Sequence, residues 1–140
     1  LYRYATVNAL ELAAHAGKEQ APGIIRSFAE AFIRSMPTGK QNTFANRTLP
    51  DLVYITIRQD QPVNLCGAFE KAIQPSPEGF VEPSRRCLME YAQRIYRTYT
   101  DAPAEAFAIG SGMDALTTAM SMKDALKHAA QKYLNGNEVE

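Results

Sequence analysis

The pattern of apolar and polar positions in the first part of the chain predicts one strand and two helices. Leu1–Val7 is rich in aromatic and β-branched residues, which favour a strand. Asn8 then offers a helix N-cap, and the amphipathic stretch Ala9–Ala16 ends at Gly17, as a short helix would. The next helix is marked by apolar side chains that recur near helical spacing on one face: Ile25, Phe28, Phe32 and Met36.

Past an irregular polar stretch, the middle of the chain predicts a second strand and a loop. In Leu52–Arg58 the side chains alternate between two faces, and both faces are mainly apolar, which indicates a central strand. Val63–Ile73 mixes polar and apolar residues without a clear period. Its Gly67 favours a bulge or bend, so we expect the middle of this segment to be a loop.

The last part of the chain predicts a long helix, a strand and a final helix. The helix spans about Ser84–Tyr99 and is marked by one apolar stripe: Leu88, Tyr91, Ala92, Ile95 and Tyr99. Ala104–Ile109 is expected to be a strand. Ser121 and Asp124 have the spacing of a capping box, which predicts a helix from there to Asn135 and Gly136. The order of elements predicts an α+β domain with a small sheet.

Composition adds that the chain is of ordinary globular type and that its charges balance. It has 140 residues, of which 46% are apolar, so one domain with one sizeable core is expected. Lys and Arg number 15, as do Asp and Glu, and this neutrality removes the strongest composition argument for nucleic acid or an anionic membrane. Cys66 and Cys87 are too few for a disulfide framework, so we expect two small core residues in a reducing, cytoplasmic setting. No apolar run is long enough to cross a membrane.

Motifs for catalysis, cofactors and metals are weak or incomplete. Gly110-Ser111-Gly112 with Ala115 fits the G-x-G-x-x-A dinucleotide fingerprint, but the second parallel strand that this fold needs has no room. Gly39-Lys40 resembles the end of a phosphate-binding loop whose other residues are missing. His15 and His128 are expected on helix surfaces without a nucleophile partner. We therefore expect no enzyme activity, no cofactor and no metal.

One stretch stands out by charge. Residues 31–50 contain Arg34, Lys40 and Arg47 and no acidic residue, a local charge of +3 in a neutral chain. Its centre, Gly39–Thr43, offers a lysine, two amides and free backbone N–H groups, which suit phosphates and sugar hydroxyls, and Phe44 beside it offers a ring for stacking on a base. Composition alone favours the alternative of a solvated loop with Phe44 as a core anchor.

Four blocks of sequence are similar to a known family. They are Tyr2-Arg3-Tyr4-Ala5 with Val7-Asn8, then 36–45 (MPTGKQNTFA), then Pro50-Asp51-Leu52-Val53, and then Ala68-Phe69-Glu70-Lys71. In this order and spacing they resemble the C-terminal part of the CasC family, the backbone subunit of Cascade, the type I-E CRISPR surveillance complex. From about Gly79 onward the resemblance lies in the order of elements more than in the letters.

The resemblance implies a fold and a function. The fold would be the C-terminal half of an RNA-recognition-motif-like (ferredoxin-like) palm over residues 1–140, without the N-terminal palm, the finger and most of the thumb. The function would be non-catalytic binding of CRISPR RNA by several copies of the protein, together with other Cascade subunits, and of target DNA indirectly through the guide. The residues that the resemblance places at the RNA are Lys40, Gln41, Asn42, Thr43, Arg47 and Arg3.

Three points stay open at this level. A half palm would leave a sheet edge and an apolar face uncovered, so we expect a homo-oligomer or a swapped dimer in isolation. The competing function is a protein–protein assembly module that uses the stripe of Tyr91, Ile95 and Tyr99 and binds no RNA itself. The basic flank formed by Arg85, Arg86, Arg94 and Arg97 is expected to face RNA, a neighbouring subunit or water.

Overall fold

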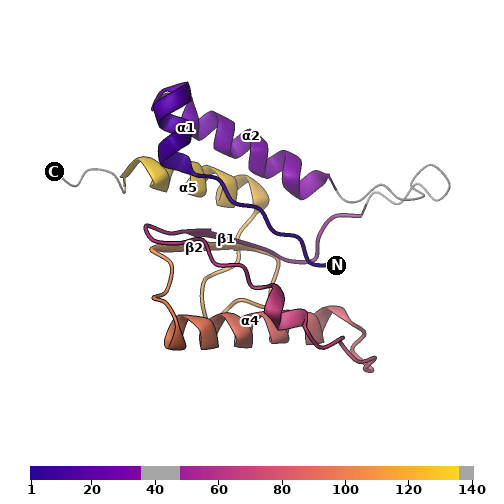
Figure 1. Cartoon of the computed structure of the whole chain (residues 1–140). Coiled ribbons are helices and arrows are strands. Elements are labelled where there is room, and N and C mark those ends of the chain that lie inside the picture. The colour runs from indigo at the N-terminus through magenta and orange to yellow at the C-terminus, as the bar shows by residue number, and fades with distance from the viewer. Residues whose placement is uncertain (36–47, 136–140) are drawn as a thin grey trace.

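In the computed structural model, which describes residues 1–35 and 48–135, a two-stranded sheet lies between two helical layers (Figure 1). One layer contains α1 (Ala9–Ala16), α2 (Ala21–Arg34) and α5 (Met122–Asn135). The sheet is formed by β1 (Val53–Ile57) and β2 (Glu105–Ile109), and α4 (Val81–Thr98) covers its other face. A short 3-10 helix, η1 (Cys66–Phe69), packs against α4. The predicted α+β class with a small antiparallel sheet is confirmed.

The ends of the helices follow local signals in the sequence. The Asn8 side chain accepts a hydrogen bond from the Glu11 backbone N–H (3.1 Å), and Gly17 ends α1 with a φ of 88°. The Ser121 hydroxyl accepts one from the Asp124 N–H (3.2 Å), so α5 begins at the predicted position. Helix α4 begins at Val81, three residues before the predicted start. Its first turn includes Pro83, which is tolerated there because the backbone N–H groups of a first turn have no partner within the helix.

The register of the sheet sorts its side chains between the two layers. β1 and β2 run antiparallel, with Ile55 opposite Phe107. Ile55, Ile57 and Phe107 pack with Ala125 and Ala129 of α5. Leu52, Tyr54 and Ala108 face the α4 side, in a cluster with Leu65, Ala92 and Met113. Each strand is therefore covered on both faces.

Two strand predictions are wrong for the described residues. Leu1–Val7 is irregular, and its aromatic side chains serve packing instead, as in the Tyr2–Phe69 ring contact with centroids 5.6 Å apart. The sequence predicts a central position for β1, yet this strand has a neighbour on one edge only, whereas β2 also forms an isolated bridge from Ala108 to Ala119. The two apolar faces of β1 come from the helices above and below it and not from two neighbouring strands.

The segment around Gly67 and the cysteines also differ from expectation. The predicted loop holds one 3-10 turn, and a Cβ at Gly67 would overlap the Tyr91 hydroxyl, so this glycine permits a close approach. Both cysteines are free, but Cys66 is exposed on η1, which contradicts a core position, while Cys87 is half-buried. No helix among the described residues has the length and apolar character needed to span a membrane.

Candidate nucleic-acid interface

Most of the predicted RNA contacts lie outside the described residues. These are Lys40, Gln41, Asn42, Thr43 and Arg47. The structure does describe both borders of the basic stretch, namely the last turn of α2 and the residues from Thr48 to β1. Arg34, the first positive charge of that stretch, forms an ion pair with Glu30 one turn earlier in α2 (3.0 Å).

Arg3 holds the end of α2. Its Nη1 donates hydrogen bonds to the carbonyl oxygens of Phe32 (3.0 Å) and Ser35, and its guanidinium lies 4.2 Å from the centroid of the Phe32 ring. Carbonyls in the last turn of a helix lack partners within the helix, and a positive charge is favourable there. The start of the chain and the end of α2 therefore lie together at one side of the molecule (Figure 1). The contact between Arg3 and RNA stays a prediction.

The basic flank of α4 faces in more than one direction. Arg85 is turned inward, where its Nη2 donates to the Asp51 carbonyl oxygen (2.9 Å) at the second border of the basic stretch. Arg86 is exposed and lies 3.8 Å from the carboxylate of Glu78. The guanidinium of Arg94 lies 4.9 Å from the centroid of the Tyr91 ring. Sequence reasoning treated the four arginines as one surface, and it missed the inward direction of Arg85.

Arg58 is the centre of a polar cluster that the sequence did not reveal. Its side chain is 6% exposed, and its Nε and Nη2 each donate to the Asp60 carboxylate at 2.7 Å. Nη2 also donates to the hydroxyl of Thr100 (2.7 Å), which joins the end of β1 to the end of α4. The hydrogen bonds from Arg58 lower the pKa of Asp60. Nearby in β1, burial raises the pKa of the Tyr54 hydroxyl.

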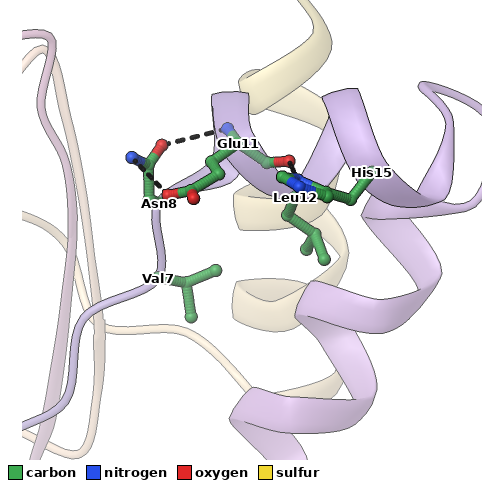
Figure 2. A pocket seen from close by; sticks show the side chains of 5 residues that line it. All are labelled: Val7, Asn8, Glu11, Leu12 and His15. Atoms are coloured by element: carbon green, nitrogen blue, oxygen red, sulfur yellow. Dashed lines mark hydrogen bonds between the residues drawn. The ribbon is translucent and has the colours of Figure 1, made fainter.

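A shallow pocket of about 430 Å3 lies at the start of α1 (Figure 2). It is lined by Val7, Asn8, Glu11, Leu12 and His15. Its polar groups bond to one another or to the backbone: the Asn8 amide donates to the Glu11 carboxylate (3.4 Å), and His15 Nδ1 lies 2.8 Å from the Glu11 carbonyl oxygen. These bonds stabilise the helix, and the pocket presents no nucleophile beside a base.

Chemistry elsewhere in the described part of the chain is equally sparse. No group of three or more His, Cys, Asp or Glu within residues 1–35 and 48–135 converges as metal ligands would. His15 and His128 are both exposed, as predicted. The Gly110-Ser111-Gly112 motif is followed by a turn at 114–116 and not by the helix that a dinucleotide site requires.

The deciding observation is a family match over nearly the whole chain. Residues 1–133 match the family described as CT1975-like protein. The chain belongs to this family. The resemblance drawn from the four sequence blocks is thereby confirmed at the level of the family. No curated protein matches the chain.

Solved structures agree with the family assignment. One chain, from a structure titled "CRISPR RNA-guided surveillance complex, pre-nicking", is 27% identical, with a TM-score of 0.78, and 91% of the present chain is covered. A second, titled "CRISPR RNA-guided surveillance complex", is 24% identical, with a TM-score of 0.74 and 90% coverage, and it supports the fold. The present chain spans 39% and 37% of the length of these two chains.

Proposed function

We propose that this chain is part of a non-catalytic, CRISPR RNA-binding backbone subunit of a Cascade-type surveillance complex. The observation that carries the proposal is the family match over residues 1–133, together with the TM-score of 0.78 to a chain of an RNA-guided surveillance complex. In this proposal the protein grips the guide backbone, and base pairing of the guide reads the target DNA. The type I-E assignment and the RNA-recognition-motif-like palm rest on the sequence resemblance.

The RNA contacts in this proposal are Lys40, Gln41, Asn42, Thr43 and Arg47, with Arg3 beside them. Lysine and arginine supply charge to the phosphates, and the amides of Gln41 and Asn42 supply both donors and acceptors to ribose hydroxyls. The local charge of +3 over residues 31–50 supports this choice in a chain whose net charge is zero. The anchoring of both borders, by Arg3 at α2 and by Arg85 at Asp51, supports it further.

The test is binding of a single-stranded RNA of about 30 nucleotides across a salt series, a length that spans several sites of ordinary single-strand binding size. Wild type is compared with the triple variant Lys40→Ala, Gln41→Ala, Asn42→Ala. The matched control is Lys18→Ala, Gln20→Ala, Gln131→Ala, which removes the same charge and two amides from exposed positions.

We expect wild-type affinity to fall as salt rises, because phosphate contacts release counterions. The triple variant at residues 40–42 should bind more weakly than wild type. Its salt slope should be smaller by about 0.7, because one phosphate is no longer neutralised by a lysine. The control should bind like wild type. Absence of wild-type binding, or equal weakening in the control, would contradict the proposal.

The second candidate is an assembly module without RNA binding of its own. The observation that favours it is the exposure of large apolar side chains, among them Tyr99 at the end of α4 (80% exposed) and Leu10 on α1 (63%). Its partners would be further copies of the chain or other subunits. An oligomer that persists at high salt by light scattering, with no RNA bound, would favour this function, since apolar contacts do not weaken with salt as phosphate contacts do.

A further inference from the structure

The side chain of Arg85 joins three segments that are far apart in the sequence. From α4 its Nη2 donates to the Asp51 carbonyl oxygen (2.9 Å), and its Nη1 donates to the Ser111 hydroxyl (3.0 Å). Nη1 also pairs with the Glu82 carboxylate one turn earlier on the same helix. The side chain is only 16% exposed. Arg85 is therefore committed to contacts within the protein, unlike its exposed neighbour Arg86.

The Gly110-Ser111-Gly112 turn is shaped around these contacts. A Cβ at Gly112 would lie 2.8 Å from the Cβ and 2.9 Å from the Cδ of Arg85, and a Cβ at Gly110 would overlap the Asp51 carbonyl oxygen. Both glycines also have positive φ angles, 87° at Gly110 and 111° at Gly112. The glycines of this motif are thus explained by the close approach of Arg85 and of the chain at Asp51.

We propose that Arg85 is a positioning residue for the RNA contacts proposed above, and this inference rests on that function. Asp51 stands between the basic stretch, which ends at Pro50, and β1, which begins at Val53. By holding the Asp51 carbonyl, Arg85 fixes where the chain leaves that stretch. The guanidinium serves these acceptors from two nitrogens, the Asp51 carbonyl from Nη2 and the Ser111 hydroxyl and Glu82 carboxylate from Nη1, whereas a lysine has a single nitrogen on a flexible stem. Fixing this border in advance reduces the ordering that RNA binding would otherwise require.

The test compares Arg85→Gln and Arg85→Lys with the same two changes at Arg86, in the chain used for the RNA assay above. Arg86 is the matched control because it is the next residue of α4 and its ion pair with Glu78 is exposed and long. Thermal unfolding is measured first, and affinity is measured at a temperature where each variant is fully folded.

Both Arg85 variants should bind the RNA about tenfold more weakly than wild type, because the border must be ordered on binding. Their salt slopes should equal that of wild type, since no phosphate contact is removed. Both Arg86 variants should stay within about twofold of wild type. Ser111→Ala, which removes one hydrogen bond and leaves Arg85 in place, should weaken binding in the same direction by less than tenfold.

Two results would overturn the proposal. If Arg85→Lys binds like wild type while the salt slope of Arg85→Gln is smaller by about 0.7, Arg85 contacts a phosphate directly. If folded Arg85→Lys and Ser111→Ala both bind like wild type, Arg85 serves stability alone. This comparison does not need Arg85→Gln, so it overturns the proposal even when Arg85→Gln does not fold. Failure of the proposed function itself looks different. In that case either wild type does not bind the RNA, or the triple variant at residues 40–42 binds it as tightly as wild type does.

Discussion

Gly110→Ala should destabilise the protein more than any other glycine-to-alanine change that the structure lets us compare. Gly110 follows β2 directly, has a φ of 87°, and faces the Asp51 backbone carbonyl so closely that a Cβ would overlap its oxygen and lie 3.3 Å from its carbon. Because the obstacle is backbone, no side-chain rotation can relieve the overlap. Either the β2 end or the chain at Asp51 must shift.

The magnitude follows from two separable causes. An alanine held at such a positive φ costs about 1–3 kcal/mol, and forcing a methyl group into a filled space costs about 1–3 kcal/mol more. Gly110→Ala should therefore lower the free energy of unfolding by about 2–6 kcal/mol, a large part of the roughly 5–15 kcal/mol that a folded domain has.

Two other glycines serve as controls because the structure separates the causes. Gly17 has almost the same φ, 88°, but nothing lies within 4 Å of a Cβ there, so Gly17→Ala should show the conformational cost alone. Gly23 lies within α2, also with open space, and Gly23→Ala should stabilise the protein by about 0.5–1 kcal/mol. The assay is urea unfolding followed by far-UV circular dichroism, with the slope compared among variants. Equal destabilisation in Gly110→Ala and Gly17→Ala would refute the contact between Gly110 and Asp51.

Two further predictions concern local contacts. Ser121→Ala removes the cap of α5 and should lower the free energy of unfolding by about 0.5–2 kcal/mol in the same urea assay, while Ser27→Ala on the exposed face of α2 should leave it nearly unchanged; an equal effect would argue against the cap. Asp60→Asn should lower stability near neutral pH, because the pKa of Asp60 is lowered in the folded protein by its hydrogen bonds from Arg58. This contribution is present above the unfolded pKa of about 3.9 and is lost as pH falls through the lower folded value, so the unfolding midpoints of Asp60→Asn and wild type should converge in acid. A difference that stays constant with pH would contradict the role of the Asp60 carboxylate.

Much of the local structure could be predicted from the sequence because its signals act over a few residues. The cap at Asn8, the end of α1 at Gly17 and the start of α5 at Ser121 depend on groups three or four positions apart, which the sequence displays directly. Short apolar runs were enough to locate β1 and β2. The family also could be predicted, because four blocks in a fixed order are specific even where each block alone is not.

Tertiary structure alone decided the features that depend on partners far away in the chain. Leu1–Val7 has the composition of a strand, but a strand also needs a hydrogen-bonded neighbour, and composition cannot supply one. The roles of Arg3 and Arg85 depend on carbonyls 29 and 34 positions away. The sequence determined the helices, the positions of β1 and β2 and which stretch is basic. Only the packed chain decided that Leu1–Val7 is not a strand and which arginines hold the borders of the basic stretch, because those features depend on distant segments that have met.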